Sequence, residues 1–148
     1  MTDFTYLKEL ETTGKTARYT MVMIALTNKD NMQHPVLICR PATEVNRAFA
    51  NEQLRITKKN VPLVRSGAVS LDTIAENRDA ERGLYAKHVI AGWENVIDGD
   101  GAQVAYDSTV CLEFLNSLPD FIFDEVRNFC TNPQNFVEAV SVEAIVKN

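Results

Sequence analysis

The sequence has few of the residues on which enzymes and metalloproteins usually depend. It contains only two histidines, His34 and His88, which are far apart and have no cysteine at the spacing of a zinc site. Cys111 and Cys130 each lie on an apolar helical face, which raises the pKa of a thiol and blocks access to it, so neither fits a nucleophile activated by His88. We therefore predict no catalytic residues, no metal and no cofactor.

Long apolar runs and a disulfide framework are also missing. The longest apolar stretch, Met21 to Leu26, is far too short to cross a bilayer, and the first fifteen residues have no run suited to a signal peptide. Three cysteines at irregular spacings, Cys39 among them, indicate buried thiols in a reducing compartment. We expect a cytoplasmic protein without a membrane partner.

Positive charge is in deficit, with a net charge of −5 and a pI near 5.0. An acidic surface repels phosphate, so nucleic acid is not expected as a partner. The basic residues Arg55, Lys58, Lys59 and Arg65 are interpreted as a solvated helix end and loop. The run Gly14-Lys15-Thr16 lacks the upstream glycine of a phosphate-binding loop, because that position is Glu9.

What is present is an ordinary globular composition, 45% hydrophobic and 24% charged. The patterning predicts a single domain over residues 1–148 with an α+β, mostly α-helical fold: an N-terminal β-hairpin followed by four to five helices. Residues 1–16 are expected to be a loose helix or a flexible arm, residues 17–40 a β-hairpin with strands at 18–27 and 35–39, and residues 42–148 a helical region with an Asp-Gly turn at 98–101.

Within the helical region, capping and breaking residues predict the individual helices. The first runs from Thr43 to about Lys58 and is followed by a connector at 60–67; the second begins after an N-cap at Ser70 and runs to about Gly92. Further helices are expected after Asp107 or Ser108, after Pro119 and over 136–145. The predicted inward stripe of the second helix is Leu71, Ile74, Ala75, Leu84, Tyr85, His88 and Val89.

The segment from Trp93 to Asp107 is the candidate structural motif or interface. An EF-hand loop begins with an oxygen ligand, has a glycine at its sixth position and ends with a glutamate at its twelfth. Counted from Asp98, those later positions are Gln103 and Thr109, and counted back from Gly101 the first is Val96, so both registers fail. We interpret Asp98-Gly99-Asp100-Gly101 as a tight turn.

The other marked residues of this segment are Trp93, Tyr106 and Asp107. Trp93 is the single tryptophan and is either a core anchor for the turn or an interface hot spot; we favour the anchor. The short runs on either side of the turn, the second ending at Tyr106, are predicted to form a minimal hairpin or an extended pair. Asp107 or Ser108 caps the next helix.

Several stretches resemble the small tail assembly chaperones of long-tailed bacteriophages. They are the strand-to-helix run from His34 to Phe49, the run from His88 to Gly101, the run from Val104 to Ser108, and Leu118 to Val126. Similar phage proteins carry a tryptophan and a short aspartate-glycine turn before a capped helix that leads into a paired helix. The resemblance covers roughly residues 34–137, and its motifs are structural.

The resemblance implies a non-enzymatic role in the host cell cytoplasm. Such proteins hold the long helical tape measure protein, keep it soluble and help to recruit tail tube protein; they often self-associate, and some have a frameshifted longer form. The alternative is a structural component of the virion, such as a minor tail or head–tail joining protein. A third hypothesis, an unrecognised enzyme, would require a pocket that holds His88 and a perturbed carboxylate.

Overall fold

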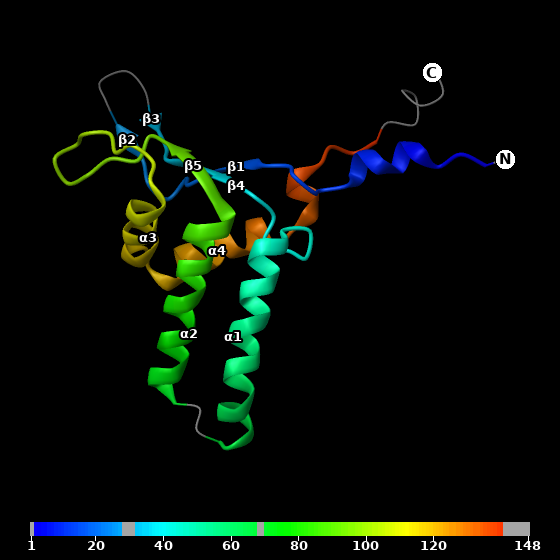
Figure 1. Cartoon of the computed structure of the whole chain (residues 1–148). Coiled ribbons are helices and arrows are strands. Elements are labelled where there is room, and N and C mark those ends of the chain that lie inside the picture. Colours follow the sequence, from blue (N-terminus) through cyan, green and yellow to red (C-terminus); the bar gives the residue numbers. More distant parts are fainter. Residues whose placement is uncertain (1, 28–31, 68–69, 141–148) are drawn as a thin grey trace.

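The computed structural model describes residues 2–27, 32–67 and 70–140 and has an α+β architecture (Figure 1). A three-stranded antiparallel sheet of order β1-β4-β5 lies at one end, and two long helices run away from it. The predicted fold class, α+β and mostly helical, is confirmed. Within these residues no helix has the length and apolar character needed to cross a bilayer.

The centre of the sheet is β4 (Val36–Cys39), an uninterrupted apolar run in which three of the four residues are buried. It pairs with β1 (Ala17–Thr20) on one side and β5 (Ile90–Glu94) on the other, and Leu37 faces a partner on both. A continuous apolar run suits a central strand because neighbouring elements cover both of its faces. Between β1 and β4 the chain forms a second, two-stranded sheet from β2 (Leu26–Thr27) and β3 (Met32–Gln33).

The helical elements follow in chain order: η1 (Thr5–Leu10), α1 (Arg47–Arg65), α2 (Leu71–Leu84), the π-helical turn η2 (Tyr85–Val89), α3 (Ser108–Ser117), α4 (Asp120–Cys130) and η3 (Pro133–Phe136). The predicted N-cap at Ser70 is confirmed, since its side chain accepts a hydrogen bond from the Thr73 amide at 3.3 Å. The helix predicted after Pro119 is also confirmed as α4.

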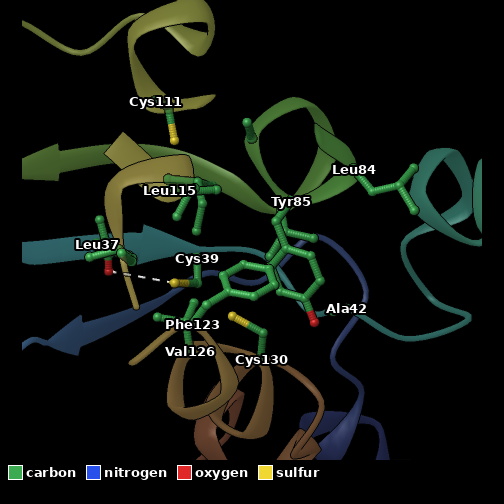
Figure 2. Packing of buried hydrophobic residues seen from close by; sticks show 14 of the residues in the cluster. Leu37, Cys39, Ala42, Leu84, Tyr85, Cys111, Leu115, Phe123, Val126 and Cys130 are labelled. Carbon is green, nitrogen blue, oxygen red and sulfur yellow. Dashed lines mark hydrogen bonds between the residues drawn. The ribbon is translucent and has the colours of Figure 1, made fainter. Parts of the chain in front are cut away.

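The hydrophobic core lies between the sheet and the helices α3, α4 and η2. Leu37 and Cys39 of β4 face Tyr85, Leu115 and other apolar side chains from these helices (Figure 2). The three cysteines are buried free thiols, as predicted, and burial raises the pKa of Cys111 to about 12. Among the described residues, no buried member of the core lies between Phe49 near the start of α1 and Leu84 at the end of α2. Most of α1 and α2 therefore lies outside the core.

The prediction that the second helix runs to Gly92 was wrong. The α-helix ends at Leu84, η2 follows, and Ile90–Glu94 forms β5. This segment becomes a strand because the free edge of β4 supplies backbone hydrogen-bond partners some fifty residues away in sequence, which helical periodicity cannot reveal. The region 42–148 therefore contains a strand, and the strand pair predicted in residues 17–40 is part of a larger sheet.

Element boundaries differ from prediction at three further places. The first strand ends at Thr20 rather than near position 27, because the buried Met21 begins a turn. The helix α1 begins at Arg47 and continues through Pro62, which lies near its end and removes only one helical hydrogen-bond donor there. At the C-terminus, Phe136 ends a short 3₁₀ turn and Val137 is extended; the remainder of the predicted last helix, from residue 141, lies outside the described residues.

Candidate partner-binding surface

Trp93 lies at the centre of an aromatic cluster rather than on an open face. Its indole N–H donates to the Val104 carbonyl at 2.9 Å, and its ring meets Tyr106 and Phe114 edge-on, with centroid distances of 5.2 and 5.5 Å. These contacts join β5 to the segment that precedes α3 and to the body of α3 itself. The geometry agrees with the anchor interpretation, since edge-to-face aromatic pairs and a satisfied indole N–H are features of packed interiors.

The aspartate-glycine segment is a closed turn. The Asp98 carboxylate accepts hydrogen bonds from the backbone amides of Asp100 at 2.9 Å and Ala102 at 3.0 Å. Gly101 has a φ of 81°, a left-handed conformation that glycine adopts without strain, and Gly99 is exposed beside it. The carboxylate of Asp98 is thus used by the turn itself. Among the residues with described positions, no group of three or more metal-ligating side chains gathers.

Tyr106 and Asp107 connect this turn to the elements on either side. The Tyr106 hydroxyl donates to the Ile90 carbonyl of β5 at 2.6 Å, and burial raises the pKa of Tyr106 to about 12. Asp107 caps α3, accepting from the amides of Thr109 at 2.8 Å and Val110 at 3.4 Å, as predicted. The segment from Trp93 to Asp107 therefore orients α3 against the sheet.

The two histidines make local contacts. His34 is 2.8 Å from the Ile24 carbonyl through Nδ1. His88 pairs with Glu52 of α1, and the hydrogen bond from His88 holds the pKa of that carboxyl below its usual range. Neither His88 nor Glu52 lines the cavities beside η1, at β1 or at the start of α1 in the described part of the chain, so the pair serves as a link between α1 and η2.

The α1–α2 hairpin, which we define as residues 47–84, projects from the rest of the molecule (Figure 1). Every described side chain from Ala50 to Glu81 is exposed or half-buried. The two helices touch through a narrow seam that includes a 2.8 Å hydrogen bond between the side chains of Asn60 and Asn77. A helical pair with so little core of its own has large faces available to another molecule.

Among the side chains of this hairpin whose burial is described, four large apolar ones are exposed: Leu54 (54%), Val61 (39%), Leu71 (84%) and Ile74 (44%). Successive residues of a helix are rotated by ~100° about its axis. On α1, Leu54 and Val61 therefore lie to one side of Asn60. On α2, Leu71 and Ile74 are displaced from Asn77 in the same direction of rotation, and Asn60 and Asn77 mark where the two helices touch. Because the two helices are antiparallel, the same direction of rotation places all four side chains on one side of the hairpin, which we call the apolar face. Exposed apolar groups that cluster mark interaction sites, whereas scattered ones need no explanation.

The apolar face is bordered by positive charge on its α1 side. The helix α1 carries five basic residues against one acidic residue, Glu52, a balance of +4 in a chain whose net charge is −5. Lys58 lies four residues after Leu54, and Arg65 lies four residues after Val61, a spacing that makes helical neighbours. Leu54 and Val61 thus each have a cation one turn further along.

Sequence reasoning missed this surface. It placed Leu71 and Ile74 on a core-facing stripe, and it treated the basic residues as a solvated helix end and loop. The charged run from Glu76 to Arg82 in α2 indicated this exposure. It interrupts the apolar stripe of the helix, and a helix with a short apolar stripe buries little of its length.

A known protein family matches the part of the chain that contains these features. The family model described as YdaY prophage protein matches residues 39–148, which include the α1–α2 hairpin and the segment from Trp93 to Asp107. No curated protein and no solved structure matches the chain.

Proposed function

The chain belongs to the YdaY prophage protein family and is of phage origin, and from this premise we propose that it is a tail assembly chaperone that binds helical segments of the phage tape measure protein. In this role it acts without catalysis in the host cytoplasm. It keeps the tape measure protein soluble and helps to bring tail tube protein to it.

The observation that carries the proposal is the apolar face of the α1–α2 hairpin. Leu54, Val61, Leu71 and Ile74 present a stripe of the kind that receives the apolar side of another helix. Fully burying an exposed valine, leucine or isoleucine side chain is worth roughly 1.5–3 kcal/mol. Three of these four side chains are already about half covered, so each contributes a fraction of that, and together they still provide a substantial part of an interface.

Charge complementarity indicates which helix would bind. Lys58 and Arg65 border the apolar face on α1, so the matching partner is a helix whose apolar stripe is flanked by aspartate or glutamate. The acidic surface of the rest of the chain would repel such a helix, which directs it to the hairpin. A second copy of this chain is the competing occupant and is distinguished in the experiment below.

The test is co-expression of the chain with the tape measure protein encoded by the same prophage, followed by affinity purification and size-exclusion chromatography. We expect a soluble heteromeric complex. Failure of the two proteins to associate would refute the proposal, and a homodimer that depends on the hairpin would assign the apolar face to self-association instead.

Paired variants locate the binding surface. The double variant Leu71→Ser and Ile74→Ser should reduce tape measure binding by about tenfold or more, because it removes two exposed apolar side chains from the hairpin. The control Val22→Ser and Met23→Ser removes two equally exposed apolar side chains from the turn after β1 and should bind normally. Equal loss in both variants would place the interface elsewhere.

Mass spectrometry of purified virions separates a chaperone from a structural component. A chaperone leaves the tail before maturation and should be absent, whereas stoichiometric presence would favour the virion protein.

A further inference from the structure

A cavity of about 250 Å³ lies at the start of α1, and no residue of the apolar face lines it. Three separate parts of the chain line it: the segment Gly14–Thr16, the residues Arg40 and Pro41 that follow β4, and the segment Val45–Arg47 that leads into α1. None of these residues has a part in the proposed binding of the tape measure protein.

The lining is strongly cationic. Lys15, Arg40 and Arg47 all border the cavity, and no aspartate or glutamate is among the lining residues. Neither arginine forms an ion pair with a carboxylate anywhere in residues 2–27, 32–67 and 70–140. Three cations that border one cavity repel one another, and an anion bound among them relieves that repulsion.

The walls of the cavity are held in place by hydrogen bonds. The Lys15 ammonium donates to the Glu9 carbonyl at 2.8 Å, which directs the end of this side chain and leaves it further protons to donate. The Asn46 side-chain amide donates to the carbonyls of Pro41 at 3.0 Å and His88 at 2.9 Å, tying the start of α1 to the end of β4 and to η2. These bonds fix the backbone of the cavity wall and the end of Lys15, and this preorganisation lowers the entropic cost of binding a ligand.

The backbone adds to the positive potential of the side chains. Asn46 caps α1 through its side-chain oxygen, which accepts from the Phe49 amide at 3.4 Å. The amides of Arg47 and Ala48 precede that residue in the first turn, and neither has an acceptor among the described residues. Their N–H groups lie at the positive end of a nineteen-residue helix.

We propose that this cavity is a binding site for a single phosphate group, supplied either by free phosphate or by the phosphomonoester of a small molecule. Two guanidinium groups and one ammonium supply the donors that phosphate oxygens prefer. The cavity is below the range of roughly 300–1,000 Å³ found for drug-sized ligands, which suits one anionic group and a short attachment. The run Gly14-Lys15-Thr16 is not a phosphate-binding loop; it meets phosphate only because the fold brings it to Arg40 and Arg47.

The experiment is a titration of the purified full chain with inorganic phosphate, and in parallel with glycerol phosphate, at constant ionic strength. Binding is measured by calorimetry and by the shifts of backbone amide signals in NMR spectra. We expect saturable binding and the largest shifts at residues 14–16, 40 and 46–48. Tighter binding of glycerol phosphate would identify a phosphomonoester as the ligand, and tighter binding of inorganic phosphate would identify the free ion; either outcome supports the site.

Charge-removing variants provide the specificity control. Arg40→Gln and Arg47→Gln should each weaken binding by about tenfold or more, because each removes charge-assisted hydrogen bonds to the anion. Both side chains are exposed, so the fold should persist, which circular dichroism can verify. The matched control Lys59→Gln removes an exposed cation of α1 that has no part in either proposed site and should bind as the unaltered chain does. No saturable binding, or equal weakening in all three variants, would overturn the proposal.

Discussion

Replacing Arg82 with methionine should lower the free energy of unfolding by about 2–4 kcal/mol, because it removes donors from buried carbonyls. Arg82 is 5% exposed at the end of α2, and its guanidinium donates to the carbonyls of Leu115 and Leu118, the latter at 2.8 Å. It also donates to Asp120 at 2.6 Å and lies 4.9 Å from the centre of the Phe123 ring. One side chain thus connects α2 to both α3 and α4.

The magnitude follows from what each partner loses. The Leu118 carbonyl has no other donor among the described residues, so the variant leaves it buried and unsatisfied at a cost of about 1–3 kcal/mol. The Leu115 carbonyl retains the Leu118 amide at 3.2 Å and loses less, on the order of 1 kcal/mol. The Asp120 side chain is 60% exposed, so water replaces its ion pair at a cost below about 1 kcal/mol.

Urea unfolding monitored by circular dichroism measures the change, and thermal unfolding should show a midpoint lowered by roughly 5–15 °C for a chain of this length. Arg78→Met is the matched control, because Arg78 pairs with the same Asp120 at 3.1 Å while its side chain is 46% exposed, against 6% for that of Arg82. It should cost less than about 1 kcal/mol. If the two variants were equally stable, the buried hydrogen bonds of Arg82 would not contribute as argued.

Three further predictions concern the links between elements. Asp107→Ala removes the cap of α3 and should cost about 1 kcal/mol in urea unfolding, whereas Asp107→Asn should preserve most of it. Tyr106→Phe removes the donor to the Ile90 carbonyl and should cost about 1 kcal/mol; no loss would show that water replaces this bond. The lowered pKa of Glu52 means that its contribution to stability is present above the unfolded-state pKa and is lost as pH falls through the folded-state value. The free energy of unfolding of Glu52→Gln should therefore fall less than that of the unaltered chain between about pH 5 and pH 3. If the free energies of unfolding of the two proteins fell in parallel with pH, the hydrogen bond between His88 and Glu52 would not stabilise the fold as argued.

Local signals allowed parts of the fold to be predicted. The caps at Ser70 and Asp107 are interactions between a side chain and amides two or three residues later, so the sequence contains all the participants. The turn from Asp98 to Gly101 depends on aspartate accepting from its own backbone and on glycine at positive φ, which is equally local. The central strand was predictable because Val36–Cys39 is short, apolar and bounded by prolines at positions 35 and 41.

The misplaced elements depend on distant partners. Ile90–Glu94 continues the helical pattern of the preceding residues, and it is a strand because β4 offers a free edge. Leu71 and Ile74 fit a core-facing stripe, and they are exposed because α2 reaches the core only near its end, where Leu84 is buried. Neither outcome can be read from a window of neighbouring residues.

The amino-acid sequence by itself determined the α+β class, the caps, the turn after Trp93 and the burial of the three thiols, because these follow from composition, periodicity and contacts between near neighbours. Tertiary structure alone decided that α1 and α2 project with an apolar face and that Lys15, Arg40 and Arg47 meet around one cavity. Both features depend on which separate segments become neighbours in the fold. The shared core, which includes β4 and Tyr85, brings these segments together from positions far apart in the chain.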